Sequence, residues 1–484
     1  MPRLTRSDEI SAYLTDASQF RGAAEGVFLP AGEKEIVEFL KEANAGKIPV
    51  TVSGGRTGLT GAAVPESGWV LSTEKLSRIL EVKKDPSGKN SRVRAEPGIF
   101  LKELRQALES QSLFYPPDPT GPKAFLGGTL ATNASGPNSF KYGATRRYVR
   151  RLRIVLASGE ILDLGRGQIR ANREGVLEIP LEKRKLKIPV PHYSLPRVKH
   201  AGGYFAEPGM DAVDLFIGAE GTLGVITEIE LSLLPKPAEV LAFIAFFPTE
   251  EKAWNFVKKI RSVAPLQPRI LEYFDHGSLE FMRPRFSTIP KGAKACLFIE
   301  EEASLANKEK LSEEWRRLFE KEGALEEVWE AESSKKREEF RDFRSALPLA
   351  IRDFLAQHAQ VKIGTDTCVP HEKFEALMLF HRHSVEKLKI PNLTFGHIGE
   401  SHVHLNLLPR NSEEHQKARA LYPELVQKAV ELGGTFSAEH GVGKLKRTYL
   451  AQFFGKKGIE EMAAVKRIFD PHLILGQGNL FEIQ

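Results

Sequence analysis

Three glycine-rich segments in the first half of this 484-residue chain limit what it can fold into. The first, residues 53–61, reads SGGRTGLTG and directly follows a short apolar run that predicts a buried strand. The second covers residues 116–121 and 127–136, and the third covers residues 218–226. Segments this small and polar pack poorly as core, whereas glycine lets backbone N–H groups approach an anion closely. Together the three segments predict walls around a large flat ligand.

The first segment differs from the two best-known phosphate-binding motifs. The order of its glycines is not that of a Rossmann turn, no helix is predicted directly after it, and the chain has no Gly-Lys-Ser/Thr. Thr57 and Thr60 add hydroxyl donors that suit a pyrophosphate. Taken alone, the segment is equally consistent with a tight surface turn, so the prediction depends on all three segments.

Composition excludes several classes of protein. Hydrophobic residues make up 41% and charged residues 27%, which argues against disorder, collagen and coiled coil, and the length favours two or three domains. Cys296 and Cys368 are too few for a disulfide framework or a cysteine-built zinc or iron–sulfur site, which fits a reducing compartment. The net charge of +6 suits an acidic small substrate or an anionic membrane surface, and interleaved acidic residues argue against nucleic acid.

The N-terminus and the hydropathy pattern bear on location. We expect no signal peptide, because the first residues lack an apolar core, and no transmembrane helix, because no apolar run is long enough. A cytoplasmic protein is expected, with peripheral contact at the inner membrane face left open.

Periodicity predicts both helices and strands. Helices are expected at residues 33–45, 101–110, 250–262, 304–345, 412–432 and 457–469, strands at 48–53, 68–72, 78–82, 213–217, 223–234, 240–247 and 295–301, and a hairpin at 151–164. The very charged stretch 301–345 predicts a solvated amphipathic helix. The run Pro-Lys-Pro at residues 235–237 predicts a domain boundary.

The strongest chemical signal lies at residues 396–406, GHIGESHVHLN, which hold three of the 13 histidines. The last five of these residues alternate as in a half-buried strand, which places His402, His404 and Asn406 on one face. Glu439 follows later, within SAEHGVG. Two imidazoles and a carboxylate are what a catalytic divalent metal needs while it keeps a position open. Each histidine alone is consistent with a structural role, and the combination favours a metal.

The motifs GGRTGLTGA, PPDPTG with GGTLATNASG, and IGAEGTLGVITE resemble the flavin-binding domain of the vanillyl-alcohol-oxidase/PCMH flavoprotein superfamily. The chain is similar to the branch that holds D-lactate dehydrogenases, D-2-hydroxyglutarate dehydrogenases and the flavin subunit of glycolate oxidase. The resemblance implies an α+β fold, with a PCMH-type FAD-binding domain of two subdomains at residues 1–237 and an α+β cap with an antiparallel sheet at 238–445. It also implies that a C-terminal helical segment, 446–484, returns to the FAD domain.

The same resemblance implies that FAD lies on residues 53–61, 117–143 and 218–227. Covalent members carry a histidine in the first segment, and Thr57 takes its place here, so noncovalent FAD is expected. The residues expected to hold FAD are Ser53, Gly54, Gly55, Arg56, Thr57, Gly58, Thr60, Pro117, Asp118, Gly127, Gly128, Thr129, Thr132, Asn133, Ser135, Gly136, Tyr142, Gly143, Glu220, Gly221, Gly224, Val225 and Ile226.

Metal-dependent members of this branch carry Gly-His-x-Gly-Asp-x-Asn-x-His-x-Asn and a later Glu-His-Gly. Matched to that pattern, His397, His404 and Glu439 are the expected metal ligands, His440 the catalytic base and Asn406 a hydrogen-bond partner of the substrate. Zinc is the first expectation for the metal, with manganese and iron as alternatives.

Two residues depart from the family pattern. Glu400 stands where Asp is frequent, and His402 stands where Asn is common. His402 has three interpretations: a fourth ligand, a substrate contact or a neutral substitution. The last two are favoured, because the residue that it replaces does not ligate.

A 2-hydroxy acid needs a cation for its carboxylate, and arginine can bind one bidentately. The segment FRDFRSALP resembles the family's substrate-arginine segment, with Arg344 a better match than Arg341, although either is also consistent with a solvated charge. Relatives also use a lysine shortly before an Asp-x-x-x-Pro turn, where this chain has Gly364, with Lys362 two residues earlier. This change favours a small monocarboxylate over a dicarboxylate such as 2-hydroxyglutarate.

The resemblance therefore implies FAD-dependent oxidation of a D-2-hydroxy acid, D-lactate-like, to the 2-oxo acid. In this hypothesis Arg344 orients the carboxylate, the metal binds carboxylate and hydroxyl, His440 removes the hydroxyl proton and hydride passes to flavin N5. Two alternatives stay open: a flavin transferase like alkylglycerone-phosphate synthase and a noncatalytic electron-relay subunit. The His/Glu set argues against both.

The expected electron acceptor is a quinone, a cytochrome, an electron-transferring flavoprotein or a ferredoxin, because no nicotinamide motif is present. The sequence leaves the acceptor, the substrate and the oligomeric state open, a homodimer among the alternatives.

Overall fold

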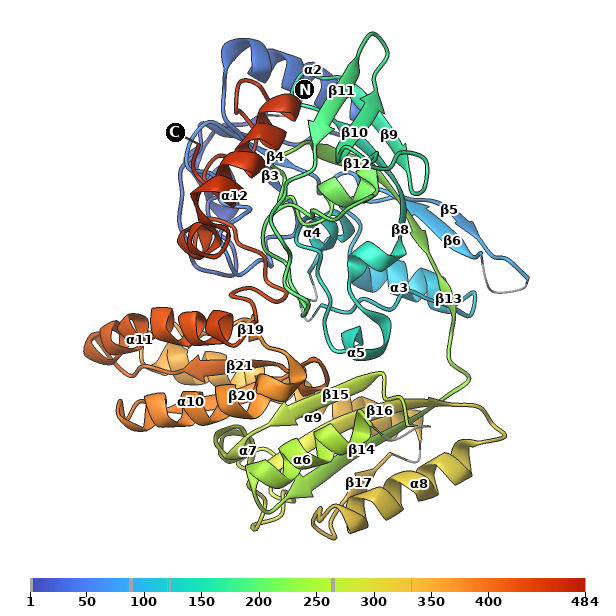
Figure 1. Ribbon diagram of the computed structural model, residues 1–484, viewed down its shortest axis with the longest axis vertical. Coiled ribbons are helices and arrows are strands. Elements are labelled where there is room, and N and C mark those ends of the chain that lie inside the picture. Colours follow the sequence, from blue (N-terminus) through green and yellow to red (C-terminus); the bar gives the residue numbers. More distant parts are fainter. Residues whose placement is uncertain are drawn as a thin grey trace.

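The computed structural model describes residues 3–86, 90–119, 121, 123–262, 266–331 and 333–483. Figure 1 shows two parts, an upper part that contains both chain termini and a lower part built around one broad sheet. Helices and mainly antiparallel sheets occur in both parts, so the predicted α+β class is confirmed.

The upper part holds two main sheets. A four-stranded sheet has the order β1-β2-β4-β3, in which β4 pairs in parallel with β2 and β3. A five-stranded antiparallel sheet has the order β5-β6-β12-β8-β9. Their strands are β1 Arg3–Leu4, β2 Gly26–Phe28, β3 Val50–Ser53, β4 Trp69–Ser72, β5 Ile79–Lys83, β6 Arg92–Ala95, β8 Val149–Val155, β9 Ile161–Gly165 and β12 Val225–Ser232. Two small pairs, β7 Leu113–Phe114 with β13 Leu234–Pro235 and β10 Val176–Pro180 with β11 Lys185–Pro189, complete it.

Helices occur between the strands of the upper part. They are α1 Ser7–Ile10, α2 Glu33–Gly46, α3 Leu101–Glu109, α4 Leu126–Ala131 and α5 Ser139–Tyr142. The apolar stripe of α2, with Ile36 and Leu40, packs in one core cluster with Leu71 of the first sheet and Val155 of the second. The helical periodicity of residues 33–45 therefore serves to hold the two sheets together.

The lower part is an antiparallel sheet of eight strands with helices on both faces (Figure 1). The strand order is β17-β14-β16-β15-β20-β21-β18, and β19 pairs with β21. The strands are β14 Glu239–Phe247, β15 Ile270–Phe274, β16 Ala295–Ala303, β17 Trp329–Glu330, β18 Ile363–Gly364, β19 Thr367–Cys368, β20 Asn392–Gly396 and β21 His402–Leu407. The helices are α6 Glu250–Ile260, α7 His276–Met282, α8 Lys308–Lys321, α9 Ser334–Gln357, α10 Phe374–Glu386 and α11 Ser412–Glu431.

The sequence of β14, EVLAFIAFF, is apolar at nearly every position because both of its faces are covered. Phe243 and Phe247 pack in a cluster with Trp254 of α6 and Trp315 of α8. Ile244 and Phe246 point the other way, into a cluster with side chains of α7 and α9. Successive side chains of a strand point to opposite faces, so a strand between two helical layers needs no polar alternation.

The last helix, α12 Arg447–Phe469, leaves the lower part and lies beside the upper sheets (Figure 1). Leu450 and Met462 share the largest upper core cluster with residues such as Leu152 of β8. This placement accords with the predicted return of residues 446–484, whereas the boundaries at 237 and 445 stay predictions. Among the described residues, no helix combines the length and apolar character that crossing a membrane requires.

Three element predictions were wrong. Residues 213–217 belong to a 3-10 helix, Ala212–Phe216, because the Asp211 carboxylate accepts the Val213 N–H at 3.0 Å and caps a helical turn. The charged stretch 304–345 is two helices, α8 and α9, separated by β17. Strand β21 is not half-buried, because side chains of α10 and α11 pack on one face and the other bears the His/Glu group, so Val403, Leu405, His402 and Asn406 are all buried.

Candidate active site

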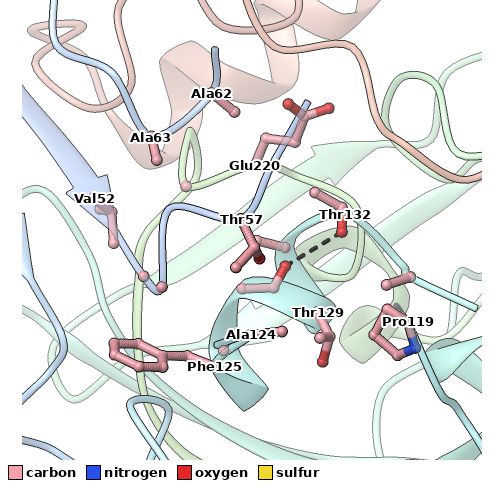
Figure 2. Close-up of a pocket in the computed structure, with 18 of the residues that line it drawn as sticks. Val52, Thr57, Ala62, Ala63, Pro119, Ala124, Phe125, Thr129, Thr132 and Glu220 are labelled. Carbon is pink, nitrogen blue, oxygen red and sulfur yellow. Dashed lines mark hydrogen bonds between the residues drawn. The ribbon is translucent and has the colours of Figure 1, made fainter. Parts of the chain in front are cut away.

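A deep pocket in the upper part lies between the end of β3, helix α4 and the loop that carries Glu220 (Figure 2). All three glycine-rich segments reach it. The predicted FAD residues that line it are Gly54, Gly55, Arg56, Thr57, Gly58, Thr60, Gly127, Gly128, Thr129, Thr132, Ser135, Gly136, Glu220, Gly221, Gly224 and Ile226.

The other predicted FAD residues lie elsewhere: Ser53, Pro117, Asp118, Asn133, Tyr142, Gly143 and Val225 are outside the pocket lining. Asp118 forms an ion pair with Arg105, and the Tyr142 hydroxyl donates to Glu302 of the lower part. Asn133 accepts the Arg146 N–H at 2.9 Å. Two positions of the predicted second segment, Thr120 and Pro122, lie outside the described residues.

Sequence reasoning missed part of the wall. The further lining residues include Val52, Ala62, Ala63, Thr73, Pro97, Pro119, Ala124, Phe125, Ala131, Ala134, Phe216, Ala219 and Leu223. Most are small residues next to the glycine-rich segments. The run of small side chains on either side of the glycines could therefore have indicated them.

The pocket has room for a flat ligand because its wall lacks side chains. Gly54 and Gly128 adjoin each other in the wall, since a Cβ built on Gly54 would stand 3.7 Å from the Cα of Gly128. A Cβ built on Gly128 would meet no atom within 4 Å and would project into the open cavity. Backbone N–H groups and threonine hydroxyls at such a wall suit the pyrophosphate and ring edges of FAD.

The histidine cluster reaches the same pocket, because Glu439 and His440 line it as well. His397, His402, His404 and Glu439 offer ligand atoms that all lie within 4.8 Å of one another. Oε1 of Glu439 lies 3.2 Å from Nε2 of His397 and 3.4 Å from Nε2 of His404. The structure therefore brings together the three predicted ligands, although they are far apart in the sequence.

The other oxygen of Glu439 is held by the upper part of the molecule. Oε2 accepts from Nζ of Lys199 at 2.7 Å and from the Ser135 hydroxyl at 2.9 Å. Burial raises the pKa of Glu439, but Lys199 and His397 outweigh it and keep the pKa well below its usual range. Glu439 is therefore an ionised carboxylate with one oxygen, Oε1, directed at the imidazoles.

Lys199 is a functional residue that the sequence did not indicate. Its side chain is 7% exposed, and its Nζ lies 3.3 Å from Glu400 as well as 2.7 Å from Glu439. Burial lowers the pKa of Lys199, but the two carboxylates outweigh it and raise the pKa above its ordinary value. Lys199 is therefore a fixed positive charge behind Glu439.

Asp366 organises the loop that bears His440. Its carboxylate is fully buried and accepts the His440 N–H at 3.0 Å, the Ser437 hydroxyl at 2.9 Å and the Lys446 ammonium at 2.8 Å. Nδ1 of His440 lies 3.6 Å from the same carboxylate. Burial lowers the pKa of His440 to about 4 although Asp366 favours the charged form, so the imidazole is neutral near pH 7.

The structure gives the cluster a set of donors that suits a divalent metal. The group of His397, His404 and Glu439 provides imidazole nitrogens and a carboxylate oxygen, and His402 has a buried Nδ1 without a hydrogen-bond partner among the described residues. Asp366, His404 and His440 form a second such group. Both oxygens of its carboxylate already accept from donors of the protein, whereas Oε1 of Glu439 faces imidazole nitrogens, so the first group fits a cation better.

The predicted substrate residues lie around this cluster. Arg344 donates to Glu272, with its Nη2 at 3.0 Å from Oε1, and Glu272 also lies 2.8 Å from Nδ1 of His397. Nζ of Lys362 donates to Oδ1 of Asn406 at 3.1 Å. Asn406 is fully buried, and its Nδ2 donates to the His404 carbonyl. Glu272 was missed, and its signal was a single carboxylate within the apolar run ILEYF.

Comparisons with known proteins find matches for both parts of the chain. The model of an FAD binding domain matches residues 24–165, and the model of the C-terminal domain of FAD linked oxidases matches residues 236–480. The glycolate oxidase subunit GlcD of Bacillus subtilis is 31% identical over 97% of this chain and 92% of its own length. A D-lactate dehydrogenase of Anaerostipes hadrus is 30% identical over 99% and 94%. An alkyldihydroxyacetonephosphate synthase structure, at 19% identity, a TM-score of 0.70 and coverage of 98% of this chain and 81% of its own, shares the fold.

Proposed function

Because the chain belongs to the family of FAD-linked oxidases, we propose that it oxidises a small D-2-hydroxy acid, such as D-lactate, to the 2-oxo acid. It is an FAD-dependent oxidoreductase of the branch with D-lactate dehydrogenases, D-2-hydroxyglutarate dehydrogenases and glycolate oxidase. One observation carries the proposal. Glu439 and His440 line the pocket that fits FAD and also belong to the His/Glu groups, so the hydride acceptor, the metal and the base would share one site.

FAD and a divalent metal would complete this site. FAD, when bound, supplies the hydride acceptor. A divalent metal held by His397, His404 and Glu439 would supply a Lewis acid that lowers the pKa of the substrate hydroxyl. Zinc, manganese or iron suits these donors.

His440 is the proposed base. Its imidazole is neutral at pH 7, and Asp366 faces Nδ1, which leaves Nε2 to accept the hydroxyl proton. The negative charge of Asp366 stabilises the imidazolium that forms. Asp366 also fixes the backbone N–H of His440, so it positions the base as well.

Arg344 and Lys362 are the proposed cations for the substrate carboxylate. Glu272 engages Nε and Nη2 of Arg344, and Nη1 has no hydrogen-bond partner among the described residues. Because the pairing with Glu272 already neutralises Arg344, one of the two cations, the site supports a monocarboxylate better than a dicarboxylate.

A quinone, cytochrome, electron-transferring flavoprotein or ferredoxin as electron acceptor is part of the same proposal.

The test replaces the base. His440→Gln should lower the rate of anaerobic flavin reduction by D-lactate about 10²–10⁴-fold, because proton removal loses its acceptor, while the bound FAD stays at its full amount. His383→Gln changes an exposed histidine of α10 and should leave the rate unchanged. A His440→Gln variant that reduces its flavin at the wild-type rate would remove His440 from this role.

A further inference from the structure

Each imidazole of the first group has one ring nitrogen beside an acceptor: those of His402 and His404 are hydrogen-bonded, whereas Nδ1 of His397 forms an ion pair without a hydrogen bond. Nδ1 of His397 lies 2.8 Å from the Glu272 carboxylate, and Nδ1 of His404 lies 2.9 Å from the Thr365 carbonyl. Nε2 of His402 lies 3.1 Å from the Asp366 carboxylate. These partners only accept, so in the neutral form that binds a metal each imidazole turns its N–H toward its partner and its lone pair toward the other side.

The three remaining nitrogens converge on one carboxylate. Nε2 of His397 and Nε2 of His404 lie 3.2 and 3.4 Å from Oε1 of Glu439, and Nδ1 of His402 lies 4.0 Å from Oε2 of the same carboxylate. His402 is fully buried, and its Nδ1 has no hydrogen-bond partner among the described residues. A buried acceptor without a donor is rare in proteins, and a cation at this point would satisfy it.

We infer that His402 is a fourth protein ligand of the metal proposed at His397, His404 and Glu439, so that the site offers three nitrogens and one oxygen. This inference rests on the proposed metal site. It also assigns Asp366 a second task, since the same carboxylate that positions the His440 loop orients the His402 ring.

The fourth ligand has a consequence for metal choice. Lys199 and Ser135 occupy Oε2 of Glu439, so the carboxylate offers only Oε1. Four protein ligands complete a tetrahedral zinc site, and substrate oxygens then bind only if the coordination number rises. The site therefore favours a metal that tolerates five or six ligands over one restricted to four.

The test counts imidazoles in the FAD-bound protein. Zinc is removed with a chelator and restored, its dissociation constant is measured against a chromophoric chelator, and the zinc-edge X-ray absorption fine structure is recorded. We expect three imidazole ligands in the wild type and two in His402→Asn. The affinity of that variant should fall by at least the ~10–100-fold that loss of an outer-shell partner costs. His383→Gln, at an exposed histidine of α10 outside the group, should match the wild type in both measurements.

The outcomes separate this inference from the proposed function. Two imidazoles in the wild type, or equal affinity in wild type and His402→Asn, would overturn the role of His402 and leave the three-ligand site intact. A wild type that binds no zinc would overturn the metal proposal and the fourth ligand together. If His402→Asn does not fold, His402→Gln takes its place, and the count in the wild type decides alone.

Discussion

The two cations expected to hold the substrate are each engaged by another polar group of the protein. Arg344 shares Glu272 with His397, and Lys362 donates to Asn406. A Cβ on Gly364 would stand 3.0 Å from Oδ1 of Asn406 and 3.9 Å from Cε of Lys362, so the lysine side chain extends over the glycine. The sequence predicted these residues, but their partners lie on other strands, and no local pattern shows which carboxylate or amide faces a given cation.

A substitution of Gly128 tests most directly whether FAD occupies the pocket. A leucine there would project into the cavity, where a Cβ meets no atom within 4 Å, so Gly128→Leu should abolish FAD binding. The fold should persist, because leucine is a better helix former than glycine within α4. The FAD content of the purified variant and the unfolding midpoint of its apoprotein are the measurements.

Gly32→Leu is the matched control for this substitution. A Cβ on Gly32 also meets no atom within 4 Å, but the residue lies at the start of α2 and away from the pocket. It should keep its FAD. A Gly128→Leu protein that retains stoichiometric FAD would contradict the placement of the cofactor.

At the scale of single elements, the sequence predicted many of the longer helices and strands and misjudged their surroundings. The run 402–406 reads as a strand with one polar face, yet that face is buried, because its polar side chains find partners inside the protein, such as Asp366 for His402 and the Thr365 carbonyl for His404. Strand β15 and helices α7 and α10 were not predicted, since their short apolar runs are ambiguous between helix and strand. The hydrogen-bond partners of buried polar side chains come from distant parts of the sequence, so hydrophobic periodicity does not reveal them.

Helix α10 contains a buried histidine, His381, that lies outside the His/Glu groups. His381 is 2% exposed, neither ring nitrogen has a partner among the described residues, and burial lowers its pKa to about 4. His381→Leu should raise the free energy of unfolding at pH 7 by about 1–3 kcal/mol, because an unsatisfied polar ring is replaced by an apolar side chain. Denaturant unfolding measures this change.

The pH dependence of the same variant provides a second readout. Between pH 6.5 and 4 the unfolded chain takes up a proton at residue 381 that the folded chain does not, so the wild type loses stability as the pH falls through this window. At pH 5 this loss is about 2 kcal/mol, and His381→Leu should lack it. His383→Leu, at an exposed position of α10, should keep the wild-type slope, and an identical slope in His381→Leu would count against the buried neutral histidine.

At the scale of the whole molecule, the end of the chain is anchored to the third glycine-rich segment. Nζ of Lys466 in α12 donates to the Thr222 carbonyl at 2.9 Å, to the Leu475 carbonyl at 2.9 Å and to Asp470 at 2.9 Å. Asp470 is fully buried and accepts the N–H groups of Ile474 and Leu475. The resemblance implied this return of the chain, whereas the residues that secure it carry no sequence signature.

Lys466→Met should therefore destabilise the protein. It leaves the Asp470 carboxylate buried without its cation, which costs about 3–5 kcal/mol, and it should also reduce FAD retention, because Thr222 adjoins Gly221 of the pocket wall. Lys456→Met breaks an exposed pair of the same helix and should change stability by less than about 1 kcal/mol. Equal unfolding midpoints for the two variants would contradict the anchoring role.

The central claim, FAD-dependent oxidation of a small D-2-hydroxy acid, is tested most directly by the anaerobic visible spectrum of the purified protein supplied with zinc or manganese. D-lactate, L-lactate, glycolate and D-2-hydroxyglutarate are added in turn, and the oxidised flavin band is followed. We predict that D-lactate bleaches the band and that L-lactate does not. A protein with bound flavin that none of the four acids bleaches would contradict the claim.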